Sequence, residues 1–450
     1  MEKIENIIRK IGFDLYKKRF EKEYLQISDL SDRDSLNNFT AQKRNELFLH
    51  AYTHTKYYRR IFDQIDLIKD ETVDLSRITE IPILTKEIIR KHHQDLISDD
   101  YQTRKWFNYY SGGSTGEPVR FIQDDIFSKW SDATRYFYFK NILNIEELTV
   151  KKVVLWGSER DLFTGSMGYK AKLTNWLFNT IFLNSLRMTE QDIEQYIRTI
   201  NSFKPELIRG YAGSLFELCR YAEKNKIPLY HPKIVVSASE NLSDTMRNVI
   251  ESNFGTKVYD VYGSREVSTL AGECKDGLLH LTLFWNYLEV LDKDNQPVRE
   301  GGEGRVVVTN LYNYSMPLIR YEIGDMATLG PEMCSCGQVL PTLKKVNGRI
   351  VGNFILKNGT IVDSGFFILL FDEVSEEAGI EKWQVIQDDY DKIQINIVAS
   401  REISDQFKND MNNKIRIGMG SECKIKWNIV DDIPKTPSGK YLSTKSLIWR

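Results

Sequence analysis

The stretch Tyr110–Val119, YSGGSTGEPV, decides how the rest of the chain is interpreted. It follows an aromatic, strand-like run and contains six consecutive small residues: Ser111, Gly112, Gly113, Ser114, Thr115 and Gly116. Such a run leaves successive backbone N–H groups free to curl around an anion, and the hydroxyl groups add donors. The stretch therefore predicts a phosphate-binding loop, but not a Walker loop, because the GK[ST] ending is missing. A plain surface loop has the same composition, so this stretch alone leaves both interpretations open.

Four further motifs follow this loop in a fixed order. They are YGSRE at 262–266, PLIRYEIGD at 317–325, the pair Gly348–Arg349, and PKTPSGKY at 434–441. The series resembles the adenylate-forming superfamily of acyl-CoA synthetases, luciferases and peptide-synthetase adenylation domains, and the resemblance covers nearly the whole chain. It is strongest to the phenylacetate–CoA ligase branch, especially to the relatives encoded with capsular polysaccharide genes.

The bulk properties are those of a large globular protein. A chain of 450 residues predicts two or more domains, and its formal net charge of −2 gives no electrostatic support for nucleic-acid binding. No stretch approaches 18 uninterrupted apolar residues, and the N-terminus lacks a secretory apolar core, so we expect neither a transmembrane segment nor a signal peptide. Five cysteines, two of them one residue apart, do not form a disulfide framework. These observations predict a cytoplasmic protein.

The N-terminal residues have an amphipathic pattern. Ile4, Ile7, Ile8 and Ile11 recur at helical spacing. A helix that docks this face on its own domain is the favoured interpretation, with a helix lying on a membrane surface as the alternative.

The alternation between residues 150 and 263 predicts a parallel sheet. Short apolar strands are expected at 153–156, 207–210, 234–237 and 258–261, with helices between them. Ser214 and Glu217 have the spacing of a capping box before one of these helices. Ligands of such a sheet bind at the carboxyl ends of its strands. Residues 1–100 read as mostly helical, and β character predominates after Glu289.

The last hundred residues predict a separate small α+β domain. Strands are expected at 383–387, 393–398 and 423–427, with a helix at 401–416. The resemblance implies the same division, into an N-terminal AMP-binding domain, 1–348, and a mobile C-terminal cap domain, 349–450. The expected fold class is α/β, with mainly parallel sheets and a β-rich subdomain in the large region.

The resemblance implies attack of a carboxylate on the α-phosphorus of ATP, which requires cations and hydrogen-bond donors around the phosphates. The loop 111–116 would hold the β- and γ-phosphates. Glu266 would bind the Mg²⁺ that bridges ATP oxygens, since carboxylates suit this hard cation. Asp325 would accept hydrogen bonds from both ribose hydroxyls.

Further nucleotide-binding residues follow from the motifs. Tyr262, beside Gly263 and Ser264 in YGSRE, would stack on adenine, although a buried core tyrosine is an alternative. Glu240 in SASEN corresponds to the adenine loop of the family, and Arg349 would bind ribose or phosphate near the hinge.

Catalysis itself would depend on the C-terminal domain. Lys440 in TPSGK would contact the carboxylate and the α-phosphate when that domain closes. Val351 and Gly352 stand where the relatives have acidic residues at the hinge. The resemblance therefore does not define how the C-terminal domain rotates.

Cys274 and His280, together with Cys334 and Cys336, form a second constellation. Three thiolates and one imidazole are a structural Zn²⁺ ligand set. Similar cysteines in phenylacetate-ligase relatives favour a metal, although four unrelated residues would give the same pattern. Cys219 and Cys423 fall in core patterns and are expected to be packing residues.

The sequence thus predicts an ATP- and Mg²⁺-dependent carboxylate ligase that forms an acyl-adenylate from a small carboxylic acid. CoA is the first candidate acceptor. An amine or sugar acceptor in polysaccharide assembly, or a non-catalytic nucleotide-binding homologue, remains an alternative.

Overall fold

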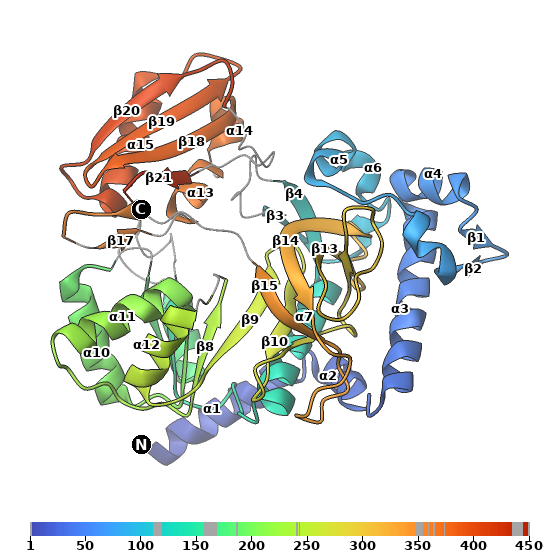
Figure 1. Ribbon diagram of the computed structural model, residues 1–450, viewed down its shortest axis with the longest axis horizontal. Coiled ribbons are helices and arrows are strands. Elements are labelled where there is room, and N and C mark those ends of the chain that lie inside the picture. Colours follow the sequence, from blue (N-terminus) through green and yellow to red (C-terminus); the bar gives the residue numbers. More distant parts are fainter. Residues whose placement is uncertain are drawn as a thin grey trace. The chain divides into compact units, whose positions relative to one another are not determined.

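The computed structural model describes residues 2–110, 119–156, 169–185, 188–239, 242, 244–347, 354–358, 360–362, 365–372, 374–433 and 444–448 (Figure 1). The chain divides into two compact units. Unit 1 comprises Met1–Ser111, Val119–Val150 and Tyr259–Gly348, and unit 2 comprises Gly112–Pro118, Lys151–Val258 and Arg349–Arg450.

The first hundred residues of unit 1 are mostly helical, which confirms the prediction. Their helices and short strands are α1 (Glu2–Lys17), α2 (Glu21–Ser28), α3 (Arg33–His54), α4 (Lys56–Gln64), β1 (Ile68–Lys69), β2 (Thr72–Val73), η1 (Leu75–Glu80), α5 (Lys86–Lys91), α6 (His93–Leu96) and η2 (Tyr101–Thr103). Side-chain caps fix several starts. Asp32 and Ser35 form a capping box at α3, and Thr85 accepts a hydrogen bond from the Ile88 N–H at the start of α5.

The rest of unit 1 is β-rich. A hairpin of β3 (Trp106–Tyr110) and β4 (Arg120–Asp124) precedes α7 (Asp125–Phe137) and the π-turn η3 (Tyr138–Ile142). Seven strands then pair antiparallel in the order β12-β13-β14-β15-β11-β10-β9. Their bounds are β9 (Val258–Ser264), β10 (Ser268–Glu273), β11 (Leu279–Leu281), β12 (Asn286–Leu291), β13 (Glu303–Asn310), β14 (Tyr321–Leu329) and β15 (Thr342–Asn347).

Arg320, at the start of β14, joins the helical and the β-rich parts of unit 1. Its guanidinium is 1% exposed and pairs with both carboxylate oxygens of Glu289, at 3.1 and 3.2 Å. It also donates to the backbone carbonyls of Thr79 and Ile81, at 2.8 and 2.7 Å. Because a buried guanidinium is costly without partners, these four bonds fix β14 against the segment before α5.

Unit 2 contains the expected strands at 153–156, 207–210 and 234–237 in a parallel sheet, whereas the strand expected at 258–261 falls in β9, which pairs antiparallel with β10. The strands of the parallel sheet lie in the order β8-β7-β5-β6, and its helices bury Val153, Leu155 and Ile208 on one face. The bounds are β5 (Lys152–Trp156), α9 (Tyr169–Leu177), β6 (Thr180–Asn184), α10 (Glu190–Phe203), β7 (Leu207–Tyr211), α11 (Ala212–Lys224), β8 (Ile234–Ala238) and α12 (Asp244–Phe254).

Strand β6 and the start of α11 differ from the expectation. Tyr211 is the N-cap of α11, and Ser214 lies in the third position of the helix, so the predicted capping box is wrong. The α/β class is confirmed.

The C-terminal segment has its own hydrophobic core, which includes Phe354, Phe371, Trp383 and Ile395. Its sheet follows the order β20-β19-β18-β21, with α15 (Asp405–Met419) capped by Ser404. The other bounds are β16 (Phe354–Ile355), β17 (Ile361–Val362), α13 (Gly365–Asp372), α14 (Ser375–Ala378), β18 (Ile380–Asp389), β19 (Lys392–Ala399), β20 (Lys424–Ile429) and β21 (Thr444–Ser446). The proposed domain boundary near 348 stays a prediction.

Helix α1 corrects one expectation. The isoleucines at positions 4, 7, 8 and 11 are 47–65% exposed and do not dock on the domain. Among the residues that the structure describes, no helix has both the length and the apolar composition needed to cross a bilayer.

Candidate nucleotide and metal sites

The motifs YGSRE and PLIRYEIGD meet in unit 1 through two reciprocal hydrogen bonds. Tyr262, near the end of β9, donates its hydroxyl to Asp325 Oδ2 on β14 at 2.9 Å. Tyr321, at the start of β14, donates its hydroxyl to Glu266 Oε1 at 3.3 Å. Each motif thus supplies a tyrosine to the carboxylate of the other motif. These contacts bring both predicted carboxylates to the same pair of segments.

Glu266 lies in a protected polar environment. Its residue is 5% exposed, and Lys86 at the start of α5 places its ammonium 4.0 Å from Oε1. Gln123 on β4 donates to the backbone carbonyls of Arg265 and Glu266, at 3.0 and 3.2 Å, and so fixes the turn that carries the carboxylate. A carboxylate held in this way is pre-positioned for a cation.

Gly263 is required by the close approach of two strands. A Cβ atom at this position would lie 2.4 Å from the Ser268 carbonyl oxygen on β10. Since real Cβ atoms do not approach backbone this closely, any larger residue would displace the turn that carries Glu266. Ser264 pairs with Ser268 across the same hairpin.

The other predicted nucleotide contacts fall outside the described residues. They are the loop Ser111–Gly116, Glu240, Arg349 and Lys440. Their roles stay predictions.

The structure brings all four predicted metal ligands together. The ligand atoms of Cys274, His280, Cys334 and Cys336 lie within 4.8 Å of one another. The Sγ atoms of Cys274 and Cys334 are 3.7 Å apart, and His280 Nε2 lies 3.1 Å from the Cys336 sulfur. This arrangement fits a closed tetrahedral site for Zn²⁺.

Two similar turns present the thiols. Cys274 and Cys334 are each followed three residues later by a glycine with positive φ, Gly277 at 82° and Gly337 at 90°. In both turns the glycine N–H donates to the cysteine carbonyl, at 3.0 and 3.2 Å. In the first turn the Asp276 N–H also points at the Cys274 sulfur, at 3.4 Å. Turns of this kind point a thiol and nearby N–H groups inward, which suits a bound thiolate.

His280 is prepared as a ligand through Nε2. Its Nδ1–H donates to the Leu340 carbonyl oxygen at 3.0 Å, which leaves the lone pair on Nε2 facing Cys336. Burial lowers the pKa of His280, so the ring is held in the neutral form that binds metals. Burial, opposed by a backbone hydrogen bond and aided by the neighbouring thiols, raises the pKa of Cys336 to about 12. A cation would remove the cost of deprotonating these crowded thiols.

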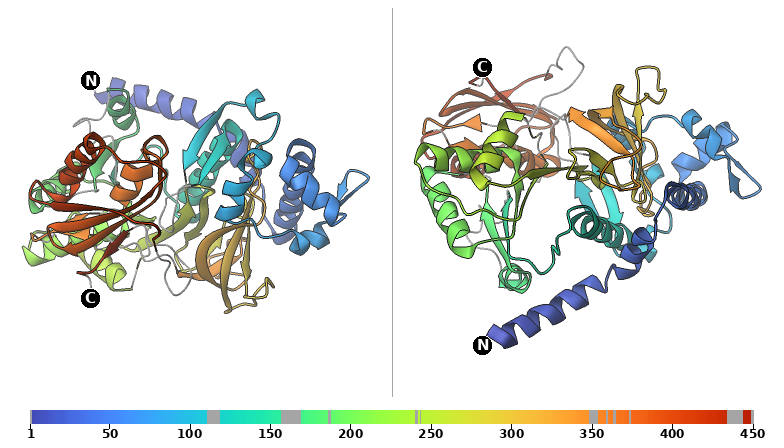
Figure 2. Two further views of the ribbon diagram at one scale, coloured as in Figure 1. Left: turned by 90° about the horizontal axis from the view of Figure 1, so that it is seen from above. Right: turned by 60° about the horizontal axis from the view of Figure 1, so that its bottom comes forward.

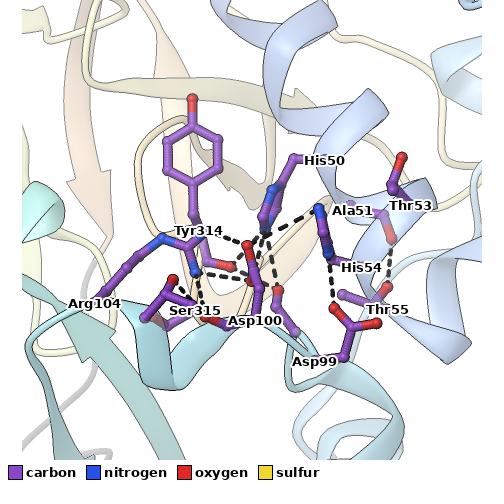
Figure 3. Close-up of polar contacts among 12 residues, drawn as sticks. His50, Ala51, Thr53, His54, Thr55, Asp99, Asp100, Arg104, Tyr314 and Ser315 are labelled. Carbon is purple, nitrogen blue, oxygen red and sulfur yellow. Dashed lines mark hydrogen bonds and ion pairs between the residues drawn. The ribbon is translucent and has the colours of Figure 1, made fainter.

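A second polar cluster lies between α3 and the segment around η2 (Figure 3). Its histidines, His50 and His54, approach Asp100 with Nε2–oxygen distances of 3.8 and 3.9 Å. Arg104 binds Asp100 through two bonds of 2.9 and 2.6 Å, and His50 Nε2–H donates to the Tyr314 carbonyl oxygen at 2.9 Å. Burial alone would raise the pKa of Asp100, but the hydrogen bonds and charge of Arg104 lower it. The Arg104 guanidinium already neutralises the Asp100 carboxylate. We therefore interpret the cluster as a structural contact between α3 and the segment around η2.

Trp156 and Tyr211 end the neighbouring strands β5 and β7 of unit 2. Their ring centroids are 4.4 Å apart, and the Arg209 guanidinium lies 5.2 Å from the Trp156 ring. These half-buried groups share the sheet face opposite the helices α10 and α11. They are placed at the carboxyl ends where parallel sheets bind ligands.

Sequence reasoning missed Lys86, Tyr321 and Gln123 as parts of the site. Lys86 lies in the segment IPILTKEIIR at 81–90 and Tyr321 lies in PLIRYEIGD, but nothing in either segment links the residue to Glu266. The sequence gives no such link for Gln123 either. Cys219 and Cys423 are buried, as expected for packing residues.

Comparison with known proteins identifies relatives along most of the chain. A family model described as the CapK C-terminal domain matches residues 354–446. Protein CapK from Staphylococcus aureus is 24% identical over 438 residues, covering 94% of this chain and 92% of that protein. The phenylacetate-coenzyme A ligase of Thermus thermophilus is 25% identical over 344 residues, covering 72% of this chain and 73% of the relative.

The fold has a solved counterpart. A 2-hydroxyisobutyryl-CoA ligase, in complex with its acyl-AMP and CoA, superposes with a TM-score of 0.58 at 17% identity, over 92% of this chain and 90% of that one. The sequence matches lead to one conclusion: the chain is homologous to CapK and to the phenylacetate–CoA ligases, and it shares the fold of a CoA ligase.

Proposed function

We propose that this protein is an ATP-dependent carboxylate ligase that activates a carboxylic acid as an acyl-adenylate, releases pyrophosphate and transfers the acyl group to CoA. The observation that carries the proposal is the reciprocal pairing of Tyr262 with Asp325 and of Tyr321 with Glu266. A fold that needed only a stable core would not require two carboxylates to be oriented by phenolic hydroxyls at the ends of two motifs.

Each group has a specific task in this reaction. Asp325, oriented by Tyr262, accepts hydrogen bonds from the ribose hydroxyls of ATP. Glu266 would hold Mg²⁺, which would supply positive charge beside the phosphates, and the loop 111–116 would bind the leaving pyrophosphate. Lys440 neutralises the charge that develops between the carboxylate and the α-phosphate.

Lys86 has a second role beside the cation. In the absence of Mg²⁺ its ammonium, 4.0 Å from Glu266, offsets the charge of the carboxylate. With Mg²⁺ and nucleotide bound, the same ammonium adds positive charge near the polyphosphate. This exchange of partners avoids leaving a buried carboxylate without a counter-charge.

We assign the acyl group to the neighbourhood of Trp156 and Tyr211, whose adjacent rings, tilted by 44° to each other, offer an aromatic surface. A panel of carboxylic acids in a pyrophosphate-release assay would identify the acid.

The four-residue cluster of Cys274, His280, Cys334 and Cys336 is proposed to hold a structural Zn²⁺. All four coordination positions are filled by protein ligands, which leaves no position for a substrate. The ion would therefore fix the β10–β11 hairpin against the connection between β14 and β15, and would take no part in the chemistry.

An acceptor other than CoA is the second candidate. The CapK relative covers 94% of this chain, whereas the phenylacetate-coenzyme A ligase covers 72%, and the C-terminal model that matches is that of CapK. CapK, unlike the second relative, is not named as a CoA ligase, so the longer match to CapK supports an amine or sugar acceptor as the alternative to the CoA thiol. A non-catalytic nucleotide-binding homologue is the third possibility.

A pyrophosphate-release assay separates these functions. A panel of aliphatic, aromatic and hydroxy acids is incubated with protein, ATP and Mg²⁺, with CoA or with hydroxylamine as a general acceptor. Release that depends on one acid supports adenylation, and a further rise with CoA alone supports the thioester. Binding of ATP by calorimetry without pyrophosphate release from any acid would support the non-catalytic homologue and overturn the proposal.

The catalytic lysine provides the internal control. Lys440→Ala should lower kcat for adenylation roughly 10²–10³-fold with little change in ATP affinity, since its contact forms mainly in the transition state. Lys445→Ala, which changes an exposed lysine on β21, should leave kcat unchanged. Equal effects of the two substitutions would remove Lys440 from the mechanism.

A further inference from the structure

Helix α1 carries large aliphatic side chains on a face that its own domain does not cover. Ile4, Ile7, Ile8, Ile11 and Leu15 are 65, 58, 47, 55 and 61% exposed. On a helix these positions form one stripe, because they recur at intervals of three and four residues. The stripe exposes on the order of 500 Å² of apolar surface, as large as the largest patch on a typical monomer.

The opposite face of α1 is the one that attaches the helix to unit 1. Phe13 is buried, and the Tyr16 hydroxyl accepts a hydrogen bond from Arg135 of α7 at 3.4 Å. The Tyr16 ring also meets Phe20 edge-on, at 5.6 Å. The helix is therefore anchored through its last turns, and Figure 2 shows its N-terminal turns reaching away from α7. Anchoring on one face leaves the aliphatic stripe directed outward.

The spacing of the stripe is symmetric. Its central positions, 4, 8, 11 and 15, are separated by four, three and four residues, which reads the same in both directions. In an antiparallel pair of such helices, with a two-fold axis between positions 8 and 11, Ile4 faces Leu15 of the second copy and Ile8 faces Ile11. A two-fold contact requires this kind of self-complementary surface. The alternation of three and four is also the seam spacing of paired helices.

We propose that α1 is a dimerisation helix, which pairs antiparallel with α1 of a second copy of this chain through the stripe at positions 4, 8, 11 and 15. Pairing two stripes buries about 1,000 Å² in total, the lower limit for a specific interface. None of the seam positions 4, 8, 11 and 15 carries a charged residue.

A membrane surface is the other candidate occupant, and the flanking residues disfavour it. Helices that lie on anionic membranes have a strongly basic polar face and aromatic residues on the apolar face. The stripe of α1 holds only isoleucine and leucine. Its flanks carry Glu5 and Asp14 beside Arg9 and Lys10, and Glu5 pairs with Arg9 at 2.9 Å.

Sedimentation velocity on the full-length protein tests the proposal. The parent should sediment as a species of about 105 kDa, twice the 52.5 kDa of one chain, at micromolar concentration. Ile8→Glu removes two seam residues per dimer by symmetry and should raise the dimer dissociation constant roughly 100-fold or more. Leu173→Glu, at a 53% exposed position on α9, is the matched control and should leave the dimer intact.

A charge-pairing experiment tests the antiparallel register. Ile8→Glu and Ile11→Lys should each be monomeric alone, and their equimolar mixture should form a heterodimer, because the substituted positions face each other in the proposed pair. Unchanged melting temperatures of the single variants would show that the folds are intact, as expected for exposed positions.

Three outcomes would overturn the proposal. The parent could be a monomer at all concentrations tested. The parent could be a dimer that Ile8→Glu does not weaken. A monomeric parent that floats with phosphatidylserine-containing vesicles, in a manner abolished by Ile8→Glu, would assign the stripe to a membrane instead.

Discussion

Replacing Cys336 by serine tests the proposed zinc site most directly. Two thiolates bound to one tetrahedral Zn²⁺ at about 2.3 Å each are about 3.8 Å apart. The Cys274 and Cys334 sulfurs are 3.7 Å apart, so these two thiols already have the separation that the ion imposes. Cys336, which faces His280 Nε2, completes the set.

The expected effect is large because the site joins several strands. His280 on β11 pairs with Thr342 on β15, and the two turns that present the thiols lie in the connections from β10 to β11 and from β14 to β15. Binding of structural Zn²⁺ contributes about 10–16 kcal/mol in small zinc domains, which is comparable to the net stability of a whole domain, about 5–15 kcal/mol. Even a loss of about 2 kcal/mol would lower the melting temperature by roughly 5 °C.

Elemental analysis and thermal unfolding provide the assay. The parent should contain about one Zn²⁺ per chain, and Cys336→Ser should lower zinc content and melting temperature together. Cys219→Ser is the matched control, since Cys219 is a fully buried thiol in the core of unit 2. That variant should lose stability through packing but retain its zinc. Parent protein that contains no zinc when prepared without chelators, and melts at the same temperature after chelator treatment, would refute the reasoning.

Further predictions concern the nucleotide site and pH. Glu266→Gln should raise the Mg²⁺ concentration needed for half-maximal pyrophosphate release, with an unchanged far-ultraviolet spectrum, and equal Mg²⁺ dependence would remove Glu266 from the site. Tyr262→Phe should raise the Kd for ATP about tenfold, because a hydrogen bond to a charged partner is worth about 1.5 kcal/mol or more and Asp325 loses its orienting donor; an unaltered Kd in calorimetry would contradict this. Burial lowers the pKa of His50, so its contribution to stability is complete above the unfolded value of about 6.5 and is lost as pH falls through the folded pKa. The melting temperature should therefore fall between pH 7 and pH 5, and His50→Gln should make this fall shallower; identical pH profiles would show that His50 takes no part.

The fold could be predicted where pattern and local chemistry coincide. The strands ending at Trp156 and Tyr211 were recognised from their apolar runs and from the helices between them. Strand β6, Thr180–Asn184, was missed because a run of five residues soon after a helix has no clear periodicity of its own. Ser214 was misread as a cap because its spacing to Glu217 is correct, while the backbone already enters the helix at Ala212.

The candidate site could be predicted only in part. The metal ligands were found because cysteine and histidine are rare enough for their spacing to carry information. Lys86 and Tyr321 act on Glu266 from segments 180 and 55 residues away in sequence, and no local pattern links them. The isoleucines of α1 were expected to dock on their own domain. Amphipathic spacing predicts an apolar face, but it does not identify the surface that covers this face.

The hydrogen bonds of Arg320 limit which segments of this protein can be exchanged during evolution. The guanidinium binds the carbonyls of Thr79 and Ile81, which are backbone groups, together with the Glu289 carboxylate. A recombination event that exchanged the first hundred residues with those of a distant relative would keep these partners only if the incoming backbone followed the same path. The helical region and the strand that carries Asp325 are therefore expected to be inherited together, and chimeras joined near residue 100 should express poorly unless Pro317–Asp325 is transferred as well.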